Sequence, residues 1–405
     1  MSKPLVLTCD IGTQSARALL VDPDGRIVDV VQSKYAEPYF SKEPGWAEQK
    51  PDFYFDRLCE CCRELCARSN ALLPDVIAMT ITVIRDTVVC LDENNNPLRD
   101  IILWLDKRSV DPNGAMPAKN MMVFKLAGME PTAKVVYAAS AGNWIMRHEP
   151  EIWARTAKYV MLPTYLNYKL TGNLIDSASN QIGHIPFDYK NRRWMKPGSL
   201  TRCFCDVPNE KLCDLVPSGT VIGTITDEVS ALTGIPAGLP LISTGSDKGC
   251  ETLGLAVVDS DKASISLGTT ATIQFSTTQY VEPQQFLPAY PGVLNDHYNP
   301  EIEIYRGLWL LSWFVKEFGT ADAIDAKEMG MAPEALLDQR IRQRRSAPAA
   351  VLDGRHPASG FARRGHRLFR LPHALPLLPR HHRGSVPGAV HGAAHHGGPL
   401  GSDHP

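Results

Sequence analysis

The sequence predicts a mixed α/β protein with two similarly built lobes, and three observations lead to this fold class. At 405 residues the chain exceeds one ordinary domain and suggests two or three, at roughly 150 residues each. Near the N-terminus, short β-rich apolar runs alternate with polar turns, and helical patterns follow. A strand, glycine–threonine turn, strand unit from this region recurs late in the chain, so we expect two related lobes with a ligand cleft between them.

The first lobe is expected to begin with a three-stranded meander. Residues 5–9 form an apolar run, residues 10–14 a polar turn, and residues 16–21 a second apolar run. Residues 23–25, Pro-Asp-Gly, are typical of a hairpin turn, because proline presets φ and glycine tolerates a positive φ. Residues 27–31 complete the meander.

Further elements are predicted from the same periodicities. The strands expected after the meander are 76–81, 87–91, 101–105, 262–267 and 272–275. The helices expected are 51–67, 149–157, 307–318 and 333–339.

The composition indicates a soluble globular protein. Hydrophobic residues make up 44% and charged residues 21%, which suffices for sizeable cores. No apolar run reaches the roughly 18 to 20 residues of a membrane span, and Asp10 interrupts the N-terminus before a signal-peptide core could form. Ten cysteines lack the density of a secreted disulfide scaffold, so we expect free thiols, a cytoplasmic location and no membrane partner.

Four cysteines cluster at Cys59, Cys61, Cys62 and Cys66, and two interpretations compete for them. Four neighbouring thiols could hold zinc. On a helix, however, Cys59, Cys62 and Cys66 share one face with apolar neighbours, where thiols behave as small core hydrophobes. We favour the core interpretation.

The C-terminal segment differs from the rest in charge and composition. From residue 341 onward there are ten Arg and no Lys against two Asp, so the segment carries +8 while the whole chain carries −2. Nine of the twelve His also lie there. A basic arm that binds nucleic acid, a histidine-rich metal tract and translation of a shifted reading frame all remain open. We favour the shifted frame, and therefore expect no nucleic-acid partner and a disordered tail.

Residues 10–15, DIGTQS, contain the parts that a nucleoside triphosphate needs. Gly12 can take a positive φ and lets amides approach phosphate oxygens, and Thr13 and Ser15 add hydroxyl donors beside Gln14. Asp10, at a strand end, could hold Mg²⁺ directly or through water. The same short pattern also occurs in ordinary turns.

A second glycine–threonine turn consists of Gly268, Thr269 and Thr270. It repeats the phosphate-binding chemistry of the first turn, and each turn lies between apolar runs. Taken alone it is a plain hairpin turn, but two such turns could grip a nucleotide from opposite sides. Together they favour a site for a magnesium-bound nucleoside triphosphate.

Asp247 follows an apolar strand and is flanked by glycines. A carboxylate at a strand end that faces a cleft can accept the proton of a hydroxyl attacking the γ-phosphate. Ser246 or Asp247 would serve equally well as a helix N-cap, so spacing alone leaves both roles open.

In their order, these residues resemble the FGGY carbohydrate kinases. The resemblance extends from the N-terminus to about residue 337, and its ordered motifs make it specific. The matching segments are DIGTQSAR (10–17), GWAEQKP (45–51), RDT (85–87) to WLDKR (104–108), LTG to DSASN (170–180), GSD (245–247) and SLGTT (266–270).

The resemblance implies an actin-like ATPase superfold of the ribonuclease H-like kind, with Mg-ATP bound between the lobes and phosphoryl transfer to a small sugar or polyol. Asp247 would be the base. Arg85 and Asp86 would bind substrate hydroxyls, unless they form a surface ion pair. Trp104 and Asp106 are further candidates to line the sugar pocket.

The domain prediction follows the resemblance. Residues 1–245 are expected to form the first lobe with the sugar site, residues 246–340 a partial second lobe with the catalytic aspartate, and residues 341–405 the anomalous tail. The family's second lobe continues to a Gly-Gly turn that holds adenosine, and Gly397-Gly398 lacks the flanking elements to serve so. An adenine pocket is therefore expected to be missing, with activity impaired and solubility low.

Two other functions stay open beside the kinase. A non-catalytic sugar-binding or regulatory remnant would keep the first lobe without transfer. An actin-like or chaperone ATPase would share the phosphate loops, but it does not explain Arg85-Asp86 or residues 45–51. The identity of the acceptor and the oligomeric state, a homodimer being one option, are not readable from the sequence.

Overall fold

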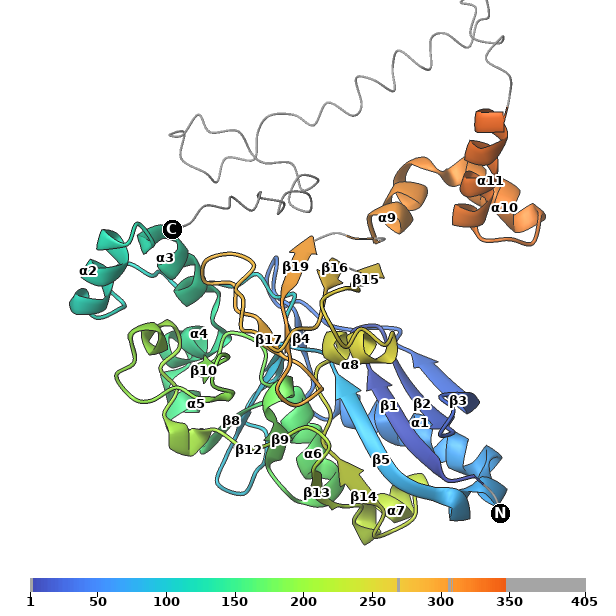
Figure 1. Ribbon diagram of the computed structural model, residues 1–405, viewed down its shortest axis with the longest axis horizontal. Coiled ribbons are helices and arrows are strands. Elements are labelled where there is room, and N and C mark those ends of the chain that lie inside the picture. The colour runs from blue at the N-terminus through green and yellow to red at the C-terminus, as the bar shows by residue number, and fades with distance from the viewer. Residues whose placement is uncertain (1–2, 268–269, 305–306, 308, 347–405) are drawn as a thin grey trace, which may run out of the picture. The chain divides into compact units, whose positions relative to one another are not determined.

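The structure is a computed structural model that describes residues 3–267, 270–304, 307 and 309–346 (Figure 1). The chain divides into two compact units, residues 1–319 and 320–405, which are treated separately below. The segment after residue 346, which carries most of the anomalous composition and Gly397-Gly398, lies outside the described residues.

The first unit is built on a six-stranded sheet with the order β13-β14-β5-β1-β2-β3. β1 pairs antiparallel with β2 and parallel with β5, and β2 pairs antiparallel with β3. The strands are β1 (Leu5–Ile11), β2 (Ser15–Val21), β3 (Ile27–Lys34), β5 (Val76–Val83), β13 (Val221–Thr224) and β14 (Pro240–Ile242). The predicted meander is confirmed, and β1 runs two residues further than expected.

The sequence pattern explains this meander. Along β1 the side chains alternate, with Leu5, Leu7, Cys9 and Ile11 buried. At the hairpin between β2 and β3, the amide of Gly25 donates to the carbonyl of Asp22 at 2.9 Å, and Gly25 has φ +76°. This turn needs a residue in the left-handed conformation, which glycine adopts without a steric penalty.

Helix α1 (Phe53–Arg68) covers one face of the sheet and is confirmed with nearly the predicted bounds. Its buried side chains are Tyr54, Phe55, Leu58, Cys59, Cys61, Cys62, Leu65 and Cys66. The Sγ atoms of Cys62 and Cys9 are 3.5 Å apart, and burial raises the pKa of Cys59 and of Cys66 to about 12. The cysteines therefore pack as core thiols, as predicted. Helices α6 (Leu162–Thr171) and α7 (Asp227–Thr233) pack against α1.

A four-stranded sheet of order β4-β7-β6-β8 lies next to this core. Its strands are β4 (Glu48–Gln49), β6 (Val88–Leu91), β7 (Ile101–Ile102) and β8 (Lys158–Met161). The predicted strand 101–105 is thus shorter than expected, because the chain turns where the amide of Asp106 donates to the carbonyl of Leu103.

The helices around these sheets include some that were predicted and some that were not. The predicted helix 149–157 is α5 (Pro150–Arg155). The helices that the sequence analysis missed in this region are α2 (Ala118–Leu126), α3 (Glu130–Ala139), α4 (Ala141–His148), α6 and α7, with 3-10 turns at Asn70–Asp75, Ala178–Asn180, Leu200–Phe204 and Asn209–Lys211.

The two strands of the second strand–turn–strand unit are confirmed. β15 (Ser264–Leu267) and β16 (Ala271–Gln274) pair antiparallel, and β19 (Glu301–Ile304) joins β16. Helix α8 (Asp247–Gly254) precedes them and α9 (Trp309–Phe318) follows them. Short strand pairs complete the unit: β9 (Ile175–Ser177) with β12 (Asp214–Val216), β10 (Phe187–Asp188) with β11 (Arg193–Trp194), and β17 (Tyr290–Pro291) with β18 (Tyr298–Asn299).

In the second unit the described residues form two helices, α10 (Thr320–Glu328) and α11 (Pro333–Ser346). Arg340 on α11 pairs with Asp322 and Asp325 on α10. The helix predicted at 333–339 is therefore confirmed but is longer. In the described ranges, no helix combines the length and the apolar character that a membrane crossing requires.

Candidate functional site

A cavity of about 860 Å³ in the first unit brings together six of the predicted site residues. Its walls come from segments far apart in the sequence, which the sheet and α8 bring together. The predicted residues that line it are Thr13, Arg85, Asp86, Trp104, Asp247 and Thr270, together with Lys248, His184, Tyr189, Tyr290 and Glu301, which the sequence analysis did not single out.

Asp247 stands at the start of α8, and the structure separates its two possible roles. Ser246 is the N-cap, because its hydroxyl accepts a hydrogen bond from the amide of Gly249 at 3.2 Å. The carboxylate of Asp247 accepts from the amide of Lys248 at 2.8 Å, and its side chain is 26% exposed. It lines the cavity, so a ligand hydroxyl can reach it.

Asp10 lies on β1 and is not among the residues that line the cavity. Its Oδ2 is 2.6 Å from Nη1 of Arg17. Burial raises the pKa of Asp10, the contact with Arg17 lowers it, and the negative charges of Asp247 and Glu251 raise it further, with a net upward shift. The carboxylates of Asp10 and Asp247 are therefore near enough to repel each other.

The first glycine–threonine turn differs in part from the prediction. Gly12 does not adopt a positive φ, and its amide donates to the carbonyl of Ser15 at 3.0 Å inside the hairpin. Thr13 lines the cavity and accepts a hydrogen bond from Nε1 of Trp104 at 3.0 Å. Gln14 is exposed, whereas the hydroxyl of Ser15 is buried against Gln32. Of these four residues, Thr13 is the one that the fold brings into the cavity wall.

The second turn is described only at its end. Gly268 and Thr269 lie outside the described residues. Thr270 lines the cavity, and its hydroxyl hydrogen-bonds Glu303. Lys248 on α8 donates to Ser266 on β15 at 2.7 Å, which ties the helix that begins at Asp247 to the strand leading into this turn.

Arg85 is not a surface residue. Its guanidinium donates to both oxygens of Glu301, at 2.9 and 3.1 Å, and its Nε lies 3.5 Å from Oδ1 of Asp247. Glu301 is only 4% exposed and also accepts a hydrogen bond from Gln274. The surface ion pair considered for Arg85 is thereby excluded. Glu301 was missed because one strand of alternating Glu and Ile carries no sign of an arginine partner.

Asp86 also lines the cavity, but His184 engages its carboxylate. Oδ1 accepts from the amide of His184 at 2.9 Å, and Oδ2 lies 2.7 Å from Nδ1 of the same residue. Burial opposes ionisation of Asp86, but the neighbouring His184 outweighs it and lowers the pKa of Asp86. The charge of Asp86 in turn raises the pKa of His184.

Asp106 corrects a prediction, since its side chain points into the protein instead of the cavity. The carboxylate is 3% exposed and accepts three hydrogen bonds from Arg108, each of 2.8 Å, and one from the amide of Ala47 at 2.6 Å. Trp104, two residues earlier, does line the cavity. The turn between them therefore holds the tryptophan in place.

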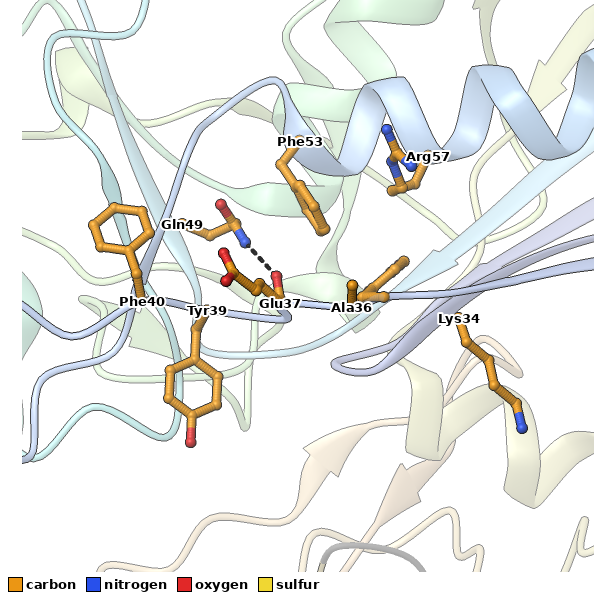
Figure 2. A pocket seen from close by; sticks show the side chains of 9 residues that line it. Lys34, Ala36, Glu37, Tyr39, Phe40, Gln49, Phe53 and Arg57 are labelled. Carbon is orange, nitrogen blue, oxygen red and sulfur yellow. Dashed lines mark hydrogen bonds between the residues drawn. The ribbon is translucent and has the colours of Figure 1, made fainter.

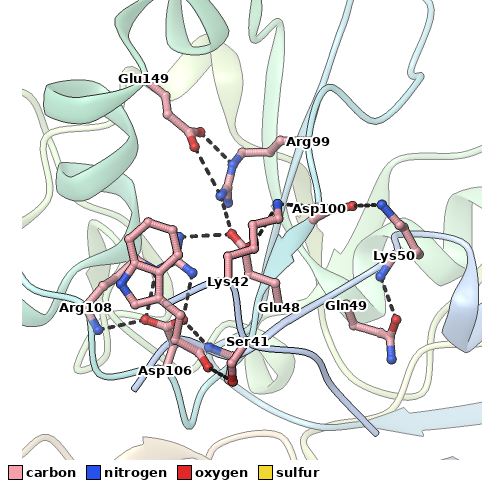
Figure 3. A network of polar contacts seen from close by, with 12 residues as sticks. Ser41, Lys42, Glu48, Gln49, Lys50, Arg99, Asp100, Asp106, Arg108 and Glu149 are labelled. Atoms are coloured by element: carbon pink, nitrogen blue, oxygen red, sulfur yellow. Dashed lines mark hydrogen bonds and ion pairs between the residues drawn. The ribbon is translucent and has the colours of Figure 1, made fainter. Parts of the chain in front are cut away.

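Figure 3 shows the network to which Asp106 belongs. Glu48, 1% exposed, pairs with Arg99 at 2.7 Å and with Arg108 at 3.0 Å. The guanidinium of Arg108 lies 3.9 Å from the ring centre of Trp46, within cation–π range. The motif at residues 45–51 thus braces the segment that carries Trp104.

Figure 2 shows a second cavity, of about 490 Å³, at the end of β3. Gln49 donates to the carbonyl of Glu37 at 3.1 Å in its wall, and the rings of Tyr35 and Phe53 meet edge to face at 5.0 Å. The predicted site residues lie elsewhere. Across the part of the chain that the structure describes, no group of three or more His, Cys, Asp or Glu is arranged to hold a metal ion.

The chain matches one protein family over more than half of its length. Residues 5–254 match the N-terminal domain of the FGGY family of carbohydrate kinases. Among curated proteins, the uncharacterized sugar kinase YgcE of Escherichia coli is 26% identical over 84% of this chain and 62% of its own length. A xylulose kinase of Bacillus subtilis is 24% identical over 66% of this chain and 52% of its own length. The chain thus spans less than two thirds of either relative.

Solved structures resemble the chain in fold. A xylulose kinase from Rhodospirillum rubrum superimposes with a TM-score of 0.67 at 22% identity, over 85% of this chain and 67% of the other. A gluconate kinase from Lactobacillus acidophilus gives 0.64 at 22% identity, over 77% and 62%. These matches confirm the predicted actin-like α/β fold.

Proposed function

The chain belongs to the FGGY family of carbohydrate kinases, and from that premise we propose that it transfers the γ-phosphoryl group of ATP to a hydroxyl of a small sugar or polyol. The observation that carries the proposal is the position of Asp247. Its carboxylate faces a cavity large enough for a sugar, and Ser246, not Asp247, caps the helix. A carboxylate at a helix start that opens on the acceptor cavity is suited to take the hydroxyl proton.

Arg85 and Glu301 would position that base. The bidentate contact fixes the guanidinium, and its Nε then approaches Asp247 from one side. Thr270 and Lys248 stand on the same cavity wall, where a hydroxyl and an ammonium group are suited to phosphate oxygens. Together with Thr13 they are the described residues that we assign to the phosphates, and Gly268 and Thr269 stay predictions.

The residues near Asp10 fit Mg²⁺ held largely by water and phosphate. Mg²⁺ usually keeps several waters and takes one or two carboxylates. Asp10 supplies such a carboxylate: burial, and to a smaller extent the charges of Asp247 and Glu251, raise its pKa, and a bound cation would favour its ionised form. When bound, the ion would neutralise charge that develops on the transferred group. Asp10 would hold it and Arg17 would orient Asp10.

The cavity lining favours a neutral acceptor over a sugar acid. Its charged residues are three cations, Arg85, Lys190 and Lys248, against six carboxylates, Asp86, Asp188, Asp247, Glu282, Glu301 and Glu303. A carboxylate substrate would meet net repulsion, whereas hydroxyls can both donate and accept. We therefore propose a ketose or polyol, as for the relatives named xylulose kinase, in preference to gluconate.

The domain assignment accompanies this proposal. We assign residues 1–245 to a first kinase lobe and residues 246–340 to a partial second lobe. A cytoplasmic location stays a prediction from the sequence, and a homodimer stays one option for the oligomeric state.

Replacing Asp247 with Asn tests the proposal. ADP release is measured with D-xylulose, xylitol, glycerol and gluconate as acceptors. We expect turnover to fall about 1,000-fold, because general-base catalysis is lost, while ATP affinity stays unchanged. Asp227→Asn is a matched control, since Asp227 also begins a helix behind a capping hydroxyl, that of Thr226, but is exposed outside the cavity. Equal turnover in Asp247→Asn and the unchanged protein would refute the base assignment, and no ADP release with any acceptor would refute the kinase.

A further inference from the structure

His184 presents one ring nitrogen to the substrate cavity. Its side chain is 35% exposed and lines the cavity. Nδ1 is committed to Asp86 at 2.7 Å, and the backbone amide of His184 binds the other carboxylate oxygen at 2.9 Å. Within the described residues, Nε2 has no hydrogen-bond partner. The carboxylate therefore fixes both the ring orientation and the tautomer.

Two unusual backbone positions hold this pair together. Asp86 has φ +46°, a left-handed conformation that costs a non-glycine residue on the order of 1 kcal/mol. Gly183 has φ +151°, and a Cβ there would lie 2.3 Å from Oδ1 of Asp86. The hydroxyl of Tyr189 braces the same loop by contacting the amide of Gly183 at 3.1 Å and its carbonyl at 2.9 Å. Such strain persists where the surroundings enforce it, and it clusters at ligand sites.

Three other polar groups of the cavity wall are already bonded within the protein. Glu301 takes the guanidinium of Arg85, Thr13 takes the indole of Trp104, and Gly183 takes the hydroxyl of Tyr189. Nε2 of His184, by contrast, has no partner within the described residues, and the side chain lines the cavity. At Nε2, a neutral imidazole accepts a hydrogen bond and an imidazolium donates one. A hydroxyl can donate or accept, so a neutral polyol fits both protonation states.

We propose that His184 determines acceptor specificity: its Nε2 hydrogen-bonds one hydroxyl of the bound ketose or polyol, and Asp86 positions the ring through Nδ1. This inference rests on the proposed function. It changes the role of Asp86, which orients His184 and does not itself bind the substrate. A site built to bond a hydroxyl rejects analogues that lack it, because the buried partner is then left unpaired.

Two substitutions at His184 separate substrate contact from support of the loop. In His184→Asn the side-chain amide can replace Nδ1 and keep the bond to Asp86, but nothing replaces Nε2. In His184→Gln the longer amide can replace Nε2. With D-xylulose and xylitol as probes, we expect His184→Asn to raise the acceptor KM about tenfold or more, with kcat and the KM for ATP little changed. His184→Gln should recover most of the loss, and both variants should keep the thermal midpoint of the unchanged protein.

Deoxy analogues of the better probe locate the contact. For one analogue, which lacks the hydroxyl that His184 binds, the unchanged protein and His184→Asn should show equal KM. Asp86→Asn should raise KM alone but add nothing in the His184→Asn background. An unchanged acceptor KM in His184→Asn, or an equal penalty with every deoxy analogue, would overturn the inference while leaving the kinase intact.

The failure of the inference is distinguishable from the failure of the function. Calorimetric titration of the acceptor should show weakened binding in His184→Asn and retained binding in Asp247→Asn, which loses turnover instead. If the unchanged protein neither binds nor phosphorylates any probe, both proposals fail together. If His184→Asn unfolds, the comparison between His184→Gln and Asp86→Asn decides: equal acceptor KM in these two variants would contradict the positioning role.

Discussion

Two clusters in the first unit are built from arginine and carboxylate side chains, but they differ in what surrounds them. The Glu48 network, made of Glu48, Arg99, Asp106 and Arg108, has a buried centre: the side chains of Glu48, Asp106 and Arg108 are 1%, 3% and 2% exposed, and its partners Lys42 and Glu149 reach solvent (Figure 3). The Asp247 cluster, made of Arg85, Asp247 and Glu301, opens on the cavity, and Asp247 is 26% exposed. A closed network can only bind itself, whereas an open one retains an atom for a ligand.

Geometry supports this distinction. In the Glu48 network, Arg108 meets Asp106 through parallel contacts of 2.8 Å, which is typical of strong charge-assisted pairs. In the Asp247 cluster, Arg85 lies 3.5 Å from Asp247 and makes its two shorter contacts with Glu301. The looser contact leaves Asp247 able to exchange its partner for a substrate hydroxyl.

The largest effect is expected for Arg108→Met, which removes an arginine from the Glu48 network. Removal of the guanidinium leaves Glu48 and Asp106 as buried charges with fewer partners, which typically costs about 3–5 kcal/mol. We expect the free energy of unfolding, measured in urea by tryptophan fluorescence, to fall by that amount. A loss below about 1 kcal/mol would show that the network is not the structural brace inferred here.

The corresponding change in the open cluster is Glu301→Gln. The amide offers Arg85 one acceptor in place of two, so the guanidinium shifts toward Asp247 and holds it more tightly. We expect kcat to fall about tenfold, equivalent to about 1.4 kcal/mol, with a smaller change in stability. Glu228→Gln, on the exposed face of α7, is the control and should leave kcat unchanged. An unaltered kcat in Glu301→Gln would remove Glu301 from the positioning of the base.

A smaller effect is expected for the pair of Asp86 and His184, and it depends on pH. The raised pKa of His184 contributes stability that is present below its ordinary value of 6.5 and is lost as pH rises through the raised value. The lowered pKa of Asp86 contributes stability that is present above 3.8 and is lost as pH falls through the lowered value.

The stability difference between the unchanged protein and Asp86→Asn should therefore be largest between about pH 4 and 6.5 and should shrink at higher pH. Because both side chains are partly exposed, we expect on the order of 1 kcal/mol or less. Urea unfolding across this pH range measures it. A difference that grows from pH 6.5 to 9 would contradict the assigned ion pair.

The smallest effect is expected at the surface pair of Lys3 and Asp24, whose side chains are 60% and 51% exposed. Solvent screens such a pair, so Asp24→Asn should change the free energy of unfolding by less than about 0.5 kcal/mol. It serves as the exposed reference for the two clusters, and a loss as large as that of Arg108→Met would undermine the argument from burial.

Much of the fold was predictable because its signals are local. The alternation in β1, the Pro-Asp-Gly turn and the apolar face of α1 each lie within a short segment, and all three are confirmed. The helices α2, α3 and α4 were missed, as was the early end of the strand at Ile102, which depends on a turn at Asp106. Packing from elsewhere in the chain overrides weak local preference at such places.

The candidate site was predictable in residue identity but only partly in geometry. The motifs indicated Asp247, Arg85 and Trp104, and all three line the cavity. They also suggested Asp106, which the fold turns inward. Glu301 and His184 were missed, because neither lies near its partner in the sequence.

By itself, the sequence determined the meander, the order of the motifs and the kinds of side chain available, since these follow from local periodicity and residue chemistry. Only the tertiary structure decided which carboxylates stay open to a ligand and which are sealed. Asp86 and His184 are separated by 98 positions, and Arg85 and Glu301 by 216. Whether the members of each pair meet therefore depends on how the fold arranges distant segments. Burial and partner geometry are properties of that arrangement, and they distinguish a site from a brace.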